Sequence, residues 1–269
     1  MPLGEDASLR TTRVRLFVEA DLQPGGEVVL SRMQTHYLTR VMRLAVREGV
    51  RLFNGRDGEW QAQIQAVGRG GCVLRIGGCL RAQLAEPGPW LGFAPLKKDA
   101  QDTLIAQATE LGVEKMIPVH TRFTSVGRVN RPRLLAQAIE SSEQCGRLNV
   151  PEVAAPCFLQ NLLSEWPASR PLLFADERGF GRPIAEAANG QPLDACSEPP
   201  GLLIGPEGGF ADEEVREILA HPCVAAVALG PRILRAETAA VAALACWQAL
   251  RGDWRRIDHP GSHDVRTES

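Results

Sequence analysis

The sequence predicts a two-domain α/β protein, in which a small β-barrel precedes a larger domain with a mainly parallel sheet. Three observations support this fold class. The first 80 residues contain short apolar strands separated by turn residues. From Trp90 onward, apolar strands alternate with helical segments. Between these parts, Gln83–Pro89 has the Pro- and Gly-containing composition of a linker. We expect a barrel over residues 1–82, an α/β domain over 83–252 and a polar tail over 253–269.

The predicted barrel contains five strands and one helix. Glycine-containing turns separate the strands, as is typical of small all-β domains. The helix is predicted over Gln34–Leu44, where Leu38, Val41 and Met42 share one face. The expected strands are Val14–Val18, Glu27–Leu30, Val50–Asn54, Glu59–Val67 and Cys72–Ile76.

The second domain is predicted to alternate strands and helices. Asp99 can cap its first helix, and Gly112 lies where a C-terminal cap belongs. Because the strands are continuously apolar, we expect a mainly parallel sheet that helices cover on both faces. The expected strands are Trp90–Ala94, Lys115–Val119, Pro171–Ala175, Gly201–Gly205 and Val224–Leu229. The later helices are expected at Arg131–Cys145, Pro183–Asn189, Asp212–Ala220 and Glu237–Leu250.

The composition excludes several classes of protein. Hydrophobic residues make up 44% and charged residues 23% of the 269, which argues against disorder and coiled coil. Apolar stretches such as Ala239–Trp247 are far shorter than the roughly 20 residues of a membrane helix. The first six residues lack the basic start and apolar block of a signal peptide. We expect a soluble, cytoplasmic protein without a membrane partner.

The cysteines give no sign of a metal site or a disulfide framework. There are 7, an odd number, and no C-x-x-C pair or nearby His cluster accompanies them. We interpret them as reduced and mostly buried thiols, and we expect no metal.

Positive charge is concentrated near the N-terminus. Residues 1–90 contain 12 Arg and 9 acidic residues, although the whole chain has a net charge of −2. Glu48 is the single acid in a stretch with six arginines. This cluster is either a solvated face or a contact for RNA or DNA phosphates. The six are Arg32, Arg40, Arg43, Arg47, Arg51 and Arg56.

The loop Gly205–Phe210 follows an apolar strand, at the end where ligands bind in open α/β sheets. Its three glycines let the backbone approach a ligand closely, and Glu207 adds one negative charge. The acids Asp212–Glu214 that follow would favour the helix dipole but repel a phosphate. Neither a P-loop nor a strand-linked G-x-G-x-x-G is present. The loop is either an ordinary glycine-rich turn or a site for a ligand without phosphate.

A second loop, Gly230–Glu237, follows the strand Val224–Leu229. Its charged residues Arg232, Arg235 and Glu237 are not needed for packing, and they form either a structural ion pair or part of a site. Two such loops on neighbouring strand ends predict one pocket for a neutral or cationic heterocyclic ligand, bound by backbone amides and carbonyls.

The two loops carry a family resemblance. Leu203–Gly209 and Leu229–Ala239 resemble the paired C-terminal motifs of the RsmE family, the 16S rRNA (uracil-1498-N3)-methyltransferases of the SPOUT superfamily. The resemblance spans about residues 13–251, and the two loop motifs together are highly specific. Other segments that resemble the family, in the same order, are His36–Arg43, Glu110–Val113 with Pro118, and Glu143–Arg147.

The resemblance implies a PUA-like β-barrel for RNA, followed by a SPOUT α/β domain with a deep trefoil knot. It implies S-adenosylmethionine as cofactor, a homodimer with each active site near the subunit interface, and 16S rRNA of the small ribosomal subunit as partner. The chain departs from the family at Ala236 and Ala239, where many members have Thr. A hydroxyl group is therefore missing at each position, while backbone contacts survive.

The resemblance also assigns site residues. A sulfonium cofactor has no phosphate, which suits a glycine loop without Lys. Among the expected RNA contacts Arg15, His36, Arg40 and Arg43, the side chain of His36 either covers the barrel or meets RNA backbone. The expected cofactor residues are Leu203, Ile204, Gly205, Glu207, Gly208, Gly209, Leu229, Gly230, Ile233, Leu234, Ala236 and Thr238.

Methylation of uridine N3 requires that the N3 proton leave, and negative charge then spreads onto the flanking carbonyl oxygens. Arg235 is the candidate that stabilises this charge or orients the base, and Glu237 the candidate proton acceptor or its orienter, with Glu207 as an alternative. The base must be unpaired or flipped out. Two other hypotheses stay open: a SPOUT methyltransferase for another RNA, and an inactive RNA-binding assembly factor. Intact Arg235, Glu237 and glycine loop favour catalysis.

Overall fold

A computed structural model describes residues 14–68, 70–179, 181–188 and 198–255. The predicted tail beyond residue 255, and Cys196, lie outside the described residues. The chain folds into two compact units. The first combines Met1–Glu86 with Ile139–Val150, and the second combines Pro87–Ala138 with Pro151–Ser269. No sequence pattern indicated that residues 139–150 belong with the first unit.

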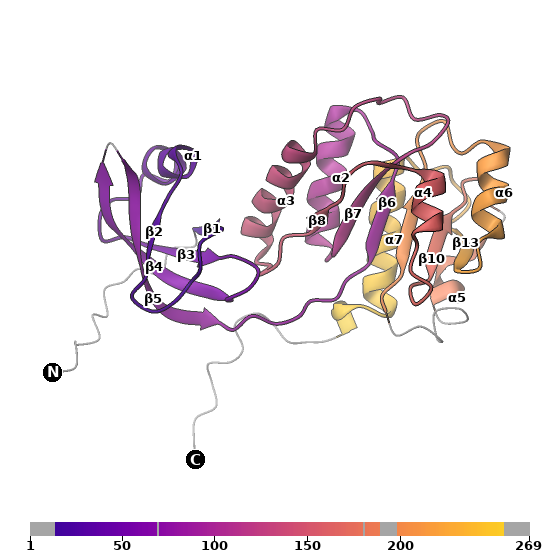
Figure 1. The fold of residues 1–269 in the computed structure, drawn as a ribbon. Coiled ribbons are helices and arrows are strands. Elements are labelled where there is room, and N and C mark those ends of the chain that lie inside the picture. Colours follow the sequence, from indigo (N-terminus) through magenta and orange to yellow (C-terminus); the bar gives the residue numbers. More distant parts are fainter. Residues whose placement is uncertain (1–13, 69, 180, 189–197, 256–269) are drawn as a thin grey trace, which may run out of the picture. The chain divides into compact units, whose positions relative to one another are not determined.

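The first unit is built on a five-stranded sheet in the order β1-β3-β4-β5-β2 (Figure 1). β1 pairs with β3 in parallel, and the other pairings are antiparallel. All five predicted strands are present, and β5 extends five residues beyond its predicted end at Ile76. The strands are β1 (Arg15–Phe17), β2 (Glu27–Val29), β3 (Gly49–Phe53), β4 (Glu59–Gly68) and β5 (Gly71–Arg81).

The helix of the first unit begins earlier and ends earlier than predicted. α1 (Arg32–His36) continues directly into a π-helical turn over Tyr37–Val41. Ser31 explains the start, because its hydroxyl accepts from the Gln34 amide while the Gln34 side chain accepts from the Ser31 amide, both at 3.2 Å. Leu38 is fully buried and anchors the π-helical turn to the core of the barrel.

The second unit contains an eight-stranded sheet in the order β11-β13-β10-β12-β6-β7-β8, with β9 paired to β7. Every pairing among its described strands is parallel, which confirms the predicted sheet type. The two-residue strands β8, β9 and β11 were not predicted. The strands are β6 (Trp90–Phe93), β7 (Lys115–His120), β8 (Glu152–Val153), β9 (Cys157–Phe158), β10 (Leu172–Ala175), β11 (Arg182–Pro183), β12 (Gly201–Ile204) and β13 (Val224–Ala228).

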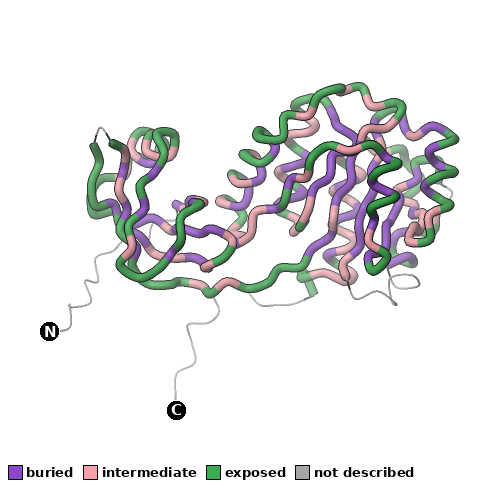
Figure 2. Tube along the Cα trace, in the orientation of Figure 1, coloured by how far each residue is buried: buried purple, intermediate pink, exposed green. Residues whose placement is uncertain are grey.

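Helices cover the central strands on both faces, and the strands themselves are mostly buried (Figure 2). On one face, apolar residues of α4 and α6 pack with Leu203 of β12. Since side chains alternate along a strand, Leu202 and Ile204 point to the other face, where α7 packs against β12 and α2. The helices are α2 (Lys98–Glu110), α3 (Arg131–Cys145), α4 (Leu159–Ser164), α5 (Ile184–Ala188), α6 (Asp212–Ala220) and α7 (Ala236–Leu250).

The predicted N-terminal cap of α2 was wrong, and its predicted C-terminal cap is confirmed. Lys97, not Asp99, is the N-cap of α2, and it makes no side-chain capping bond. Asp99 lies in the first turn, where its charge favours the helix dipole. Gly112 has a φ of +81° just after α2, as the prediction of a C-terminal cap requires. None of the described helices is long and apolar enough to cross a membrane.

Candidate functional site

One pocket lies at the carboxyl ends of the strands in the second unit. Three loops line it: Ala175–Gly179 after β10, Ile204–Glu207 after β12, and Leu229–Leu234 after β13. β10 pairs with both β12 and β13, so these two strands are not neighbours, contrary to the expectation from the sequence. The two glycine loops still share one pocket, because the intervening loop after β10 completes its wall.

The loop after β12 is shaped by close contacts that only glycine permits. A Cβ on Gly205 would lie 2.5 Å from the ring of Phe210, which itself makes an edge contact with Phe174 at 5.2 Å between centroids. Gly209 has a φ of +71°, and a Cβ there would lie 1.7 Å from a carboxylate oxygen of Glu177. These glycines let the loop fold tightly under two side chains.

Among the acids Asp212–Glu214 that follow this loop, Glu214 makes structural hydrogen bonds in addition to favouring the helix dipole. Glu214 is 8% exposed and accepts from the Ala211 amide at 2.9 Å, at the start of α6. Its other oxygen accepts from the Arg122 amide at 2.8 Å. This carboxylate therefore ties the segment after β7 to the start of α6.

The loop after β13 carries the candidate catalytic residues. Gly230 has a φ of +101°, and Arg235 is the N-cap of α7, with Glu237 in the first turn. Within the described ranges, the side chains of Arg232, Arg235 and Glu237 have no hydrogen-bond or ion-pair partner, so the structural ion pair considered above is not formed. Neither Arg235 nor Glu237 lines the pocket itself; both lie directly beside the lining residue Ala236.

The pocket gathers most of the predicted cofactor residues. Leu203 is instead buried in the core on the face of α4 and α6, and Gly208, Gly209 and Thr238 do not line the pocket. Both Ala236 and Ala239, the positions that depart from the family pattern, do line it. The predicted residues that line it are Ile204, Gly205, Glu207, Leu229, Gly230, Ile233, Leu234 and Ala236.

Sequence reasoning missed the acidic loop after β10. Asp176 is 5% exposed and accepts from the Arg178 amide at 3.1 Å and from its Nε at 3.0 Å. Glu177 also lines the pocket. Neither residue belongs to a glycine motif, so the one available signal was their position after an apolar strand.

The lining suits a cationic nucleoside better than a phosphate. Glu177 and Glu207 supply negative charge, Asp176 is paired with Arg178, and Arg232 is the single basic residue among the described lining residues. Backbone groups of the glycine loops supply donors and acceptors beside apolar side chains. This set fits S-adenosylmethionine, which combines an uncharged nucleoside with a sulfonium and an ammonium group. The described residues contain no cluster of His, Cys, Asp or Glu that could hold a metal ion.

A second hollow lies within the first unit, between α1 with its π-helical turn and the β4–β5 hairpin. We call it the basic groove; it is lined by Arg32, Thr35, His36, Thr39, Arg40, Val67, Gly68 and Gly71. Arg32, His36 and Arg40 follow one another at four-residue spacing. In the described part of the chain these three side chains, and that of Arg43, have no partner. π-Helical turns are frequent at functional sites.

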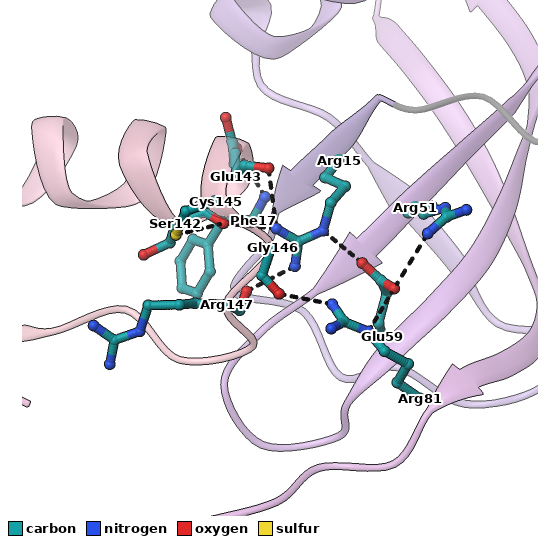
Figure 3. A network of polar contacts seen from close by, with 10 residues as sticks. All are labelled: Arg15, Phe17, Arg51, Glu59, Arg81, Ser142, Glu143, Cys145, Gly146 and Arg147. Carbon is teal, nitrogen blue, oxygen red and sulfur yellow. Dashed lines mark hydrogen bonds and ion pairs between the residues drawn. The ribbon is translucent and has the colours of Figure 1, made fainter. Parts of the chain in front are cut away.

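Two of the six arginines that are clustered between Arg32 and Arg56 in the sequence form ion pairs within the first unit. Arg51 faces Glu59 at 3.7 Å and Arg56 faces Asp21 at 2.9 Å. Arg15, which was expected to contact RNA, is also engaged: its side chain is 8% exposed and its Nε lies 2.5 Å from Glu59. Its other nitrogens donate to main-chain carbonyls of residues 142, 143 and 147 (Figure 3). These hydrogen bonds assign Arg15 a structural role, and the proposed RNA surface excludes it.

Comparisons with known proteins agree with this geometry. The protein-family model of an RNA methyltransferase domain matches residues 87–248 of the sequence. The family model of an RNA methyltransferase PUA domain matches residues 30–77. The ribosomal RNA small subunit methyltransferase E of Rickettsia conorii is 33% identical over 86% of this chain and 93% of its own length. A Legionella pneumophila methyltransferase, solved in complex with S-adenosylmethionine, is 29% identical with a TM-score of 0.76, covering 88% of this chain and 97% of that one.

The fold and the pocket thus define an RNA methyltransferase domain preceded by a PUA domain. Within that class, the chain belongs to the ribosomal RNA small subunit methyltransferase E family.

Proposed function

We propose that this chain, an S-adenosylmethionine-dependent methyltransferase of ribosomal RNA, methylates N3 of uridine 1498 in the 16S rRNA. The observation that carries the proposal is the pocket formed by the loops after β10, β12 and β13, whose described lining has two exposed glutamates and a single arginine and includes residues of the family's two glycine motifs. When bound, S-adenosylmethionine supplies an electrophilic methyl group. Backbone groups of Gly205, Leu229 and Leu234 are proposed to hold its nucleoside.

The proposed chemistry uses the free charges at the start of α7. Glu237 accepts the N3 proton of the uracil or orients the group that does. Arg235 stabilises the negative charge that appears on the flanking carbonyl oxygens. The absence of internal partners for both side chains within the described residues supports this assignment, because a structural pair would already be satisfied. Glu207, which is exposed in the glycine loop, remains the alternative proton acceptor.

The basic groove is the proposed RNA contact of the first unit. Arg40 and His36 line it, and Arg43 lies just after the π-helical turn with a φ of +56°. Arg32 joins this set, since it lines the same groove and its side chain is exposed. Phosphate contacts of this kind position an RNA, while the target base is read elsewhere.

The proposal includes a homodimer and a trefoil knot, both implied by the family resemblance. Support for the dimer comes from Ile233, which lines the pocket yet is 89% exposed. A large apolar side chain exposed beside a site suits an interface. Sedimentation at several concentrations tests the dimer.

The decisive experiment is methyl transfer from labelled S-adenosylmethionine to small ribosomal subunits that lack the modification. Mass mapping of the product should find one 3-methyluridine, at position 1498. Label at another nucleotide would favour a methyltransferase for another RNA site. Subunit binding without any transfer would favour an inactive assembly factor.

A further inference from the structure

Glu177 is an acid of the pocket whose carboxylate lies against the backbone of the glycine loop after β12. It lines the pocket from the loop after β10. In the described portion of the chain its carboxylate has no hydrogen-bond or ion-pair partner. The neighbouring carboxylate of Asp176 is held by Arg178, whose NH1 also lies 3.6 Å from Asp212. Arg178 therefore pairs directly with other acids and acts on Glu177 only through its nearby charge.

The Glu177 carboxylate lies close to the glycine loop. Its Oε1 lies so close to Gly209 that a Cβ on that glycine would be 1.7 Å away. The carboxylate thus rests on the backbone of the loop that follows β12, while its own backbone belongs to the loop that follows β10. The carboxylate is therefore placed beside two of the loops that line the pocket, where a bound ligand can reach it.

The electrostatic surroundings also favour a cationic ligand. Partial desolvation, together with the negative charge of Asp176, raises the pKa of Glu177, although Arg178 opposes the shift. A carboxylate in such surroundings is stabilised when a positive charge approaches. Glu207 is a second acid on the lining. Both glutamates are exposed, but Glu177 is the one whose carboxylate rests against Gly209.

We propose that the Glu177 carboxylate pairs with a positive charge of the bound cofactor and makes the pocket selective for the charged nucleoside. This inference rests on the proposed function and names a specificity residue for it. Two groups of S-adenosylmethionine carry positive charge, the sulfonium and the α-ammonium. Both offer the same chemistry to a carboxylate, and the experiment distinguishes them.

The experiment is calorimetric binding of three nucleosides to the full-length protein and to Glu177→Gln. S-Adenosylmethionine carries both positive charges, S-adenosylhomocysteine carries the ammonium alone, and methylthioadenosine carries neither. Glu186→Gln is the matched control, since Glu186 is an exposed acid on α5 that does not line the pocket. Glu207→Gln is the comparison with the other lining acid. Melting temperatures of all variants verify the fold.

Glu177→Gln should bind S-adenosylmethionine about tenfold to a hundredfold more weakly than the wild type, the range for a lost hydrogen bond between charged groups. Methylthioadenosine should bind equally well to both. A matching loss for S-adenosylhomocysteine identifies the ammonium as the partner, and an unchanged affinity for it identifies the sulfonium.

Three results would overturn the inference: unchanged binding of all three nucleosides, an equal loss for all three, or a selective loss in Glu207→Gln alone. Each leaves the wild-type affinity for S-adenosylmethionine intact, so the proposed function survives. If the folded wild type binds none of the nucleosides, the cofactor assignment itself fails.

Discussion

Arg15 and Glu59 form a buried ion pair with an N–O distance of 2.5 Å, and the two side chains are 8% and 1% exposed. Arg81 reaches the other carboxylate oxygen at 2.9 Å and donates to the Gly146 carbonyl at the same distance. Through these two arginines, one glutamate of β4 holds the main-chain carbonyls at and just after the end of α3 (Figure 3). The network explains why residues 139–150 join the first unit.

The first prediction concerns the stability of this network. Arg15→Ala removes one partner of a buried charge, so it should lower the free energy of unfolding by roughly 3–5 kcal/mol. Arg75→Ala is the control, because Arg75 pairs with Glu27 where both side chains are more than half exposed. Arg75→Ala should lower the free energy of unfolding by at most about 1 kcal/mol. Urea unfolding measures both, and equal losses would contradict the structural role of Arg15.

The same network predicts a dependence of stability on pH. Burial raises the pKa of Glu59, but hydrogen bonds and charges from Arg81 and Arg15 outweigh it and hold the pKa below its ordinary value. A depressed pKa stabilises the fold above the unfolded-state pKa of about 4.3, and this contribution disappears as the pH falls through the folded-state value.

The measurement compares wild type with Glu59→Gln between pH 7 and pH 3. The difference in unfolding free energy should be constant near neutrality and shrink on acidification. Glu143 has the opposite effect on the pH dependence of stability, because burial raises its pKa despite the hydrogen bond from the Phe17 amide. Its contribution is present in both proteins and cancels in the comparison. A difference that grows toward acid would show that the Glu59 interpretation is wrong.

These interactions also show where sequence reasoning reached its limit. The ranges predicted for α3 and α6 agree with the observed helices, each of which is long enough to show a buried face in the sequence. The sequence analysis missed α4, which has six residues, and the two-residue strands β8, β9 and β11, which are too short to show a hydrophobic period. Arg15 was expected to contact RNA from the family resemblance, and its carboxylate partner lies 44 residues away, where no local pattern reveals it.

The pocket, like the fold, was predicted in part from the sequence. The loops after β12 and β13 carry glycine motifs that can be recognised without a structure. The acidic loop after β10 carries none, and it reaches the pocket because β10 lies between the other two strands. Strand order arises from packing of the whole sheet, which no local pattern encodes.

The glycine loop makes a prediction about steric fit. Gly205→Ala places a Cβ 2.5 Å from the Phe210 ring, so the ring or the loop must move. Overpacking of this kind should cost about 1–3 kcal/mol and weaken cofactor binding. Gly127→Ala is the control, since no atom lies within 4 Å of its Cβ position and its φ is not positive. Equal melting temperatures and equal affinities for the two variants would contradict the prediction.

The basic groove predicts a change in salt dependence. Arg40→Ala with Arg43→Ala should weaken binding of the small subunit and flatten the slope of log affinity against log salt, by roughly one unit for each arginine that had paired with a phosphate. Affinity for S-adenosylmethionine should not change, because the groove belongs to the first unit. Arg56→Ala serves as the control, since Arg56 already pairs with Asp21. An unchanged slope in the double variant would make the two arginines a solvated face.

The last prediction concerns Arg235, the N-cap of α7, whose side chain is exposed and has no hydrogen-bond or ion-pair partner among the described residues. Because it supports no internal ion pair, Arg235→Ala should leave the melting temperature and sedimentation unchanged. It should lower single-turnover methylation about a hundredfold or more, the loss typical of removing one group that stabilises charge in a transition state. Glu237→Gln should also slow turnover, with an altered pH profile if Glu237 accepts the proton.

Melting, sedimentation and single-turnover rates measured on the same preparations separate a chemical role from a structural one. Full activity in Arg235→Ala would exclude it from the reaction. Activity lost only in parallel with unfolding or dissociation would make it a structural residue of the helix start or the dimer. A variant that is folded, keeps its affinity for S-adenosylmethionine and fails to transfer the methyl group would leave charge stabilisation at the uracil as the step that depends on Arg235.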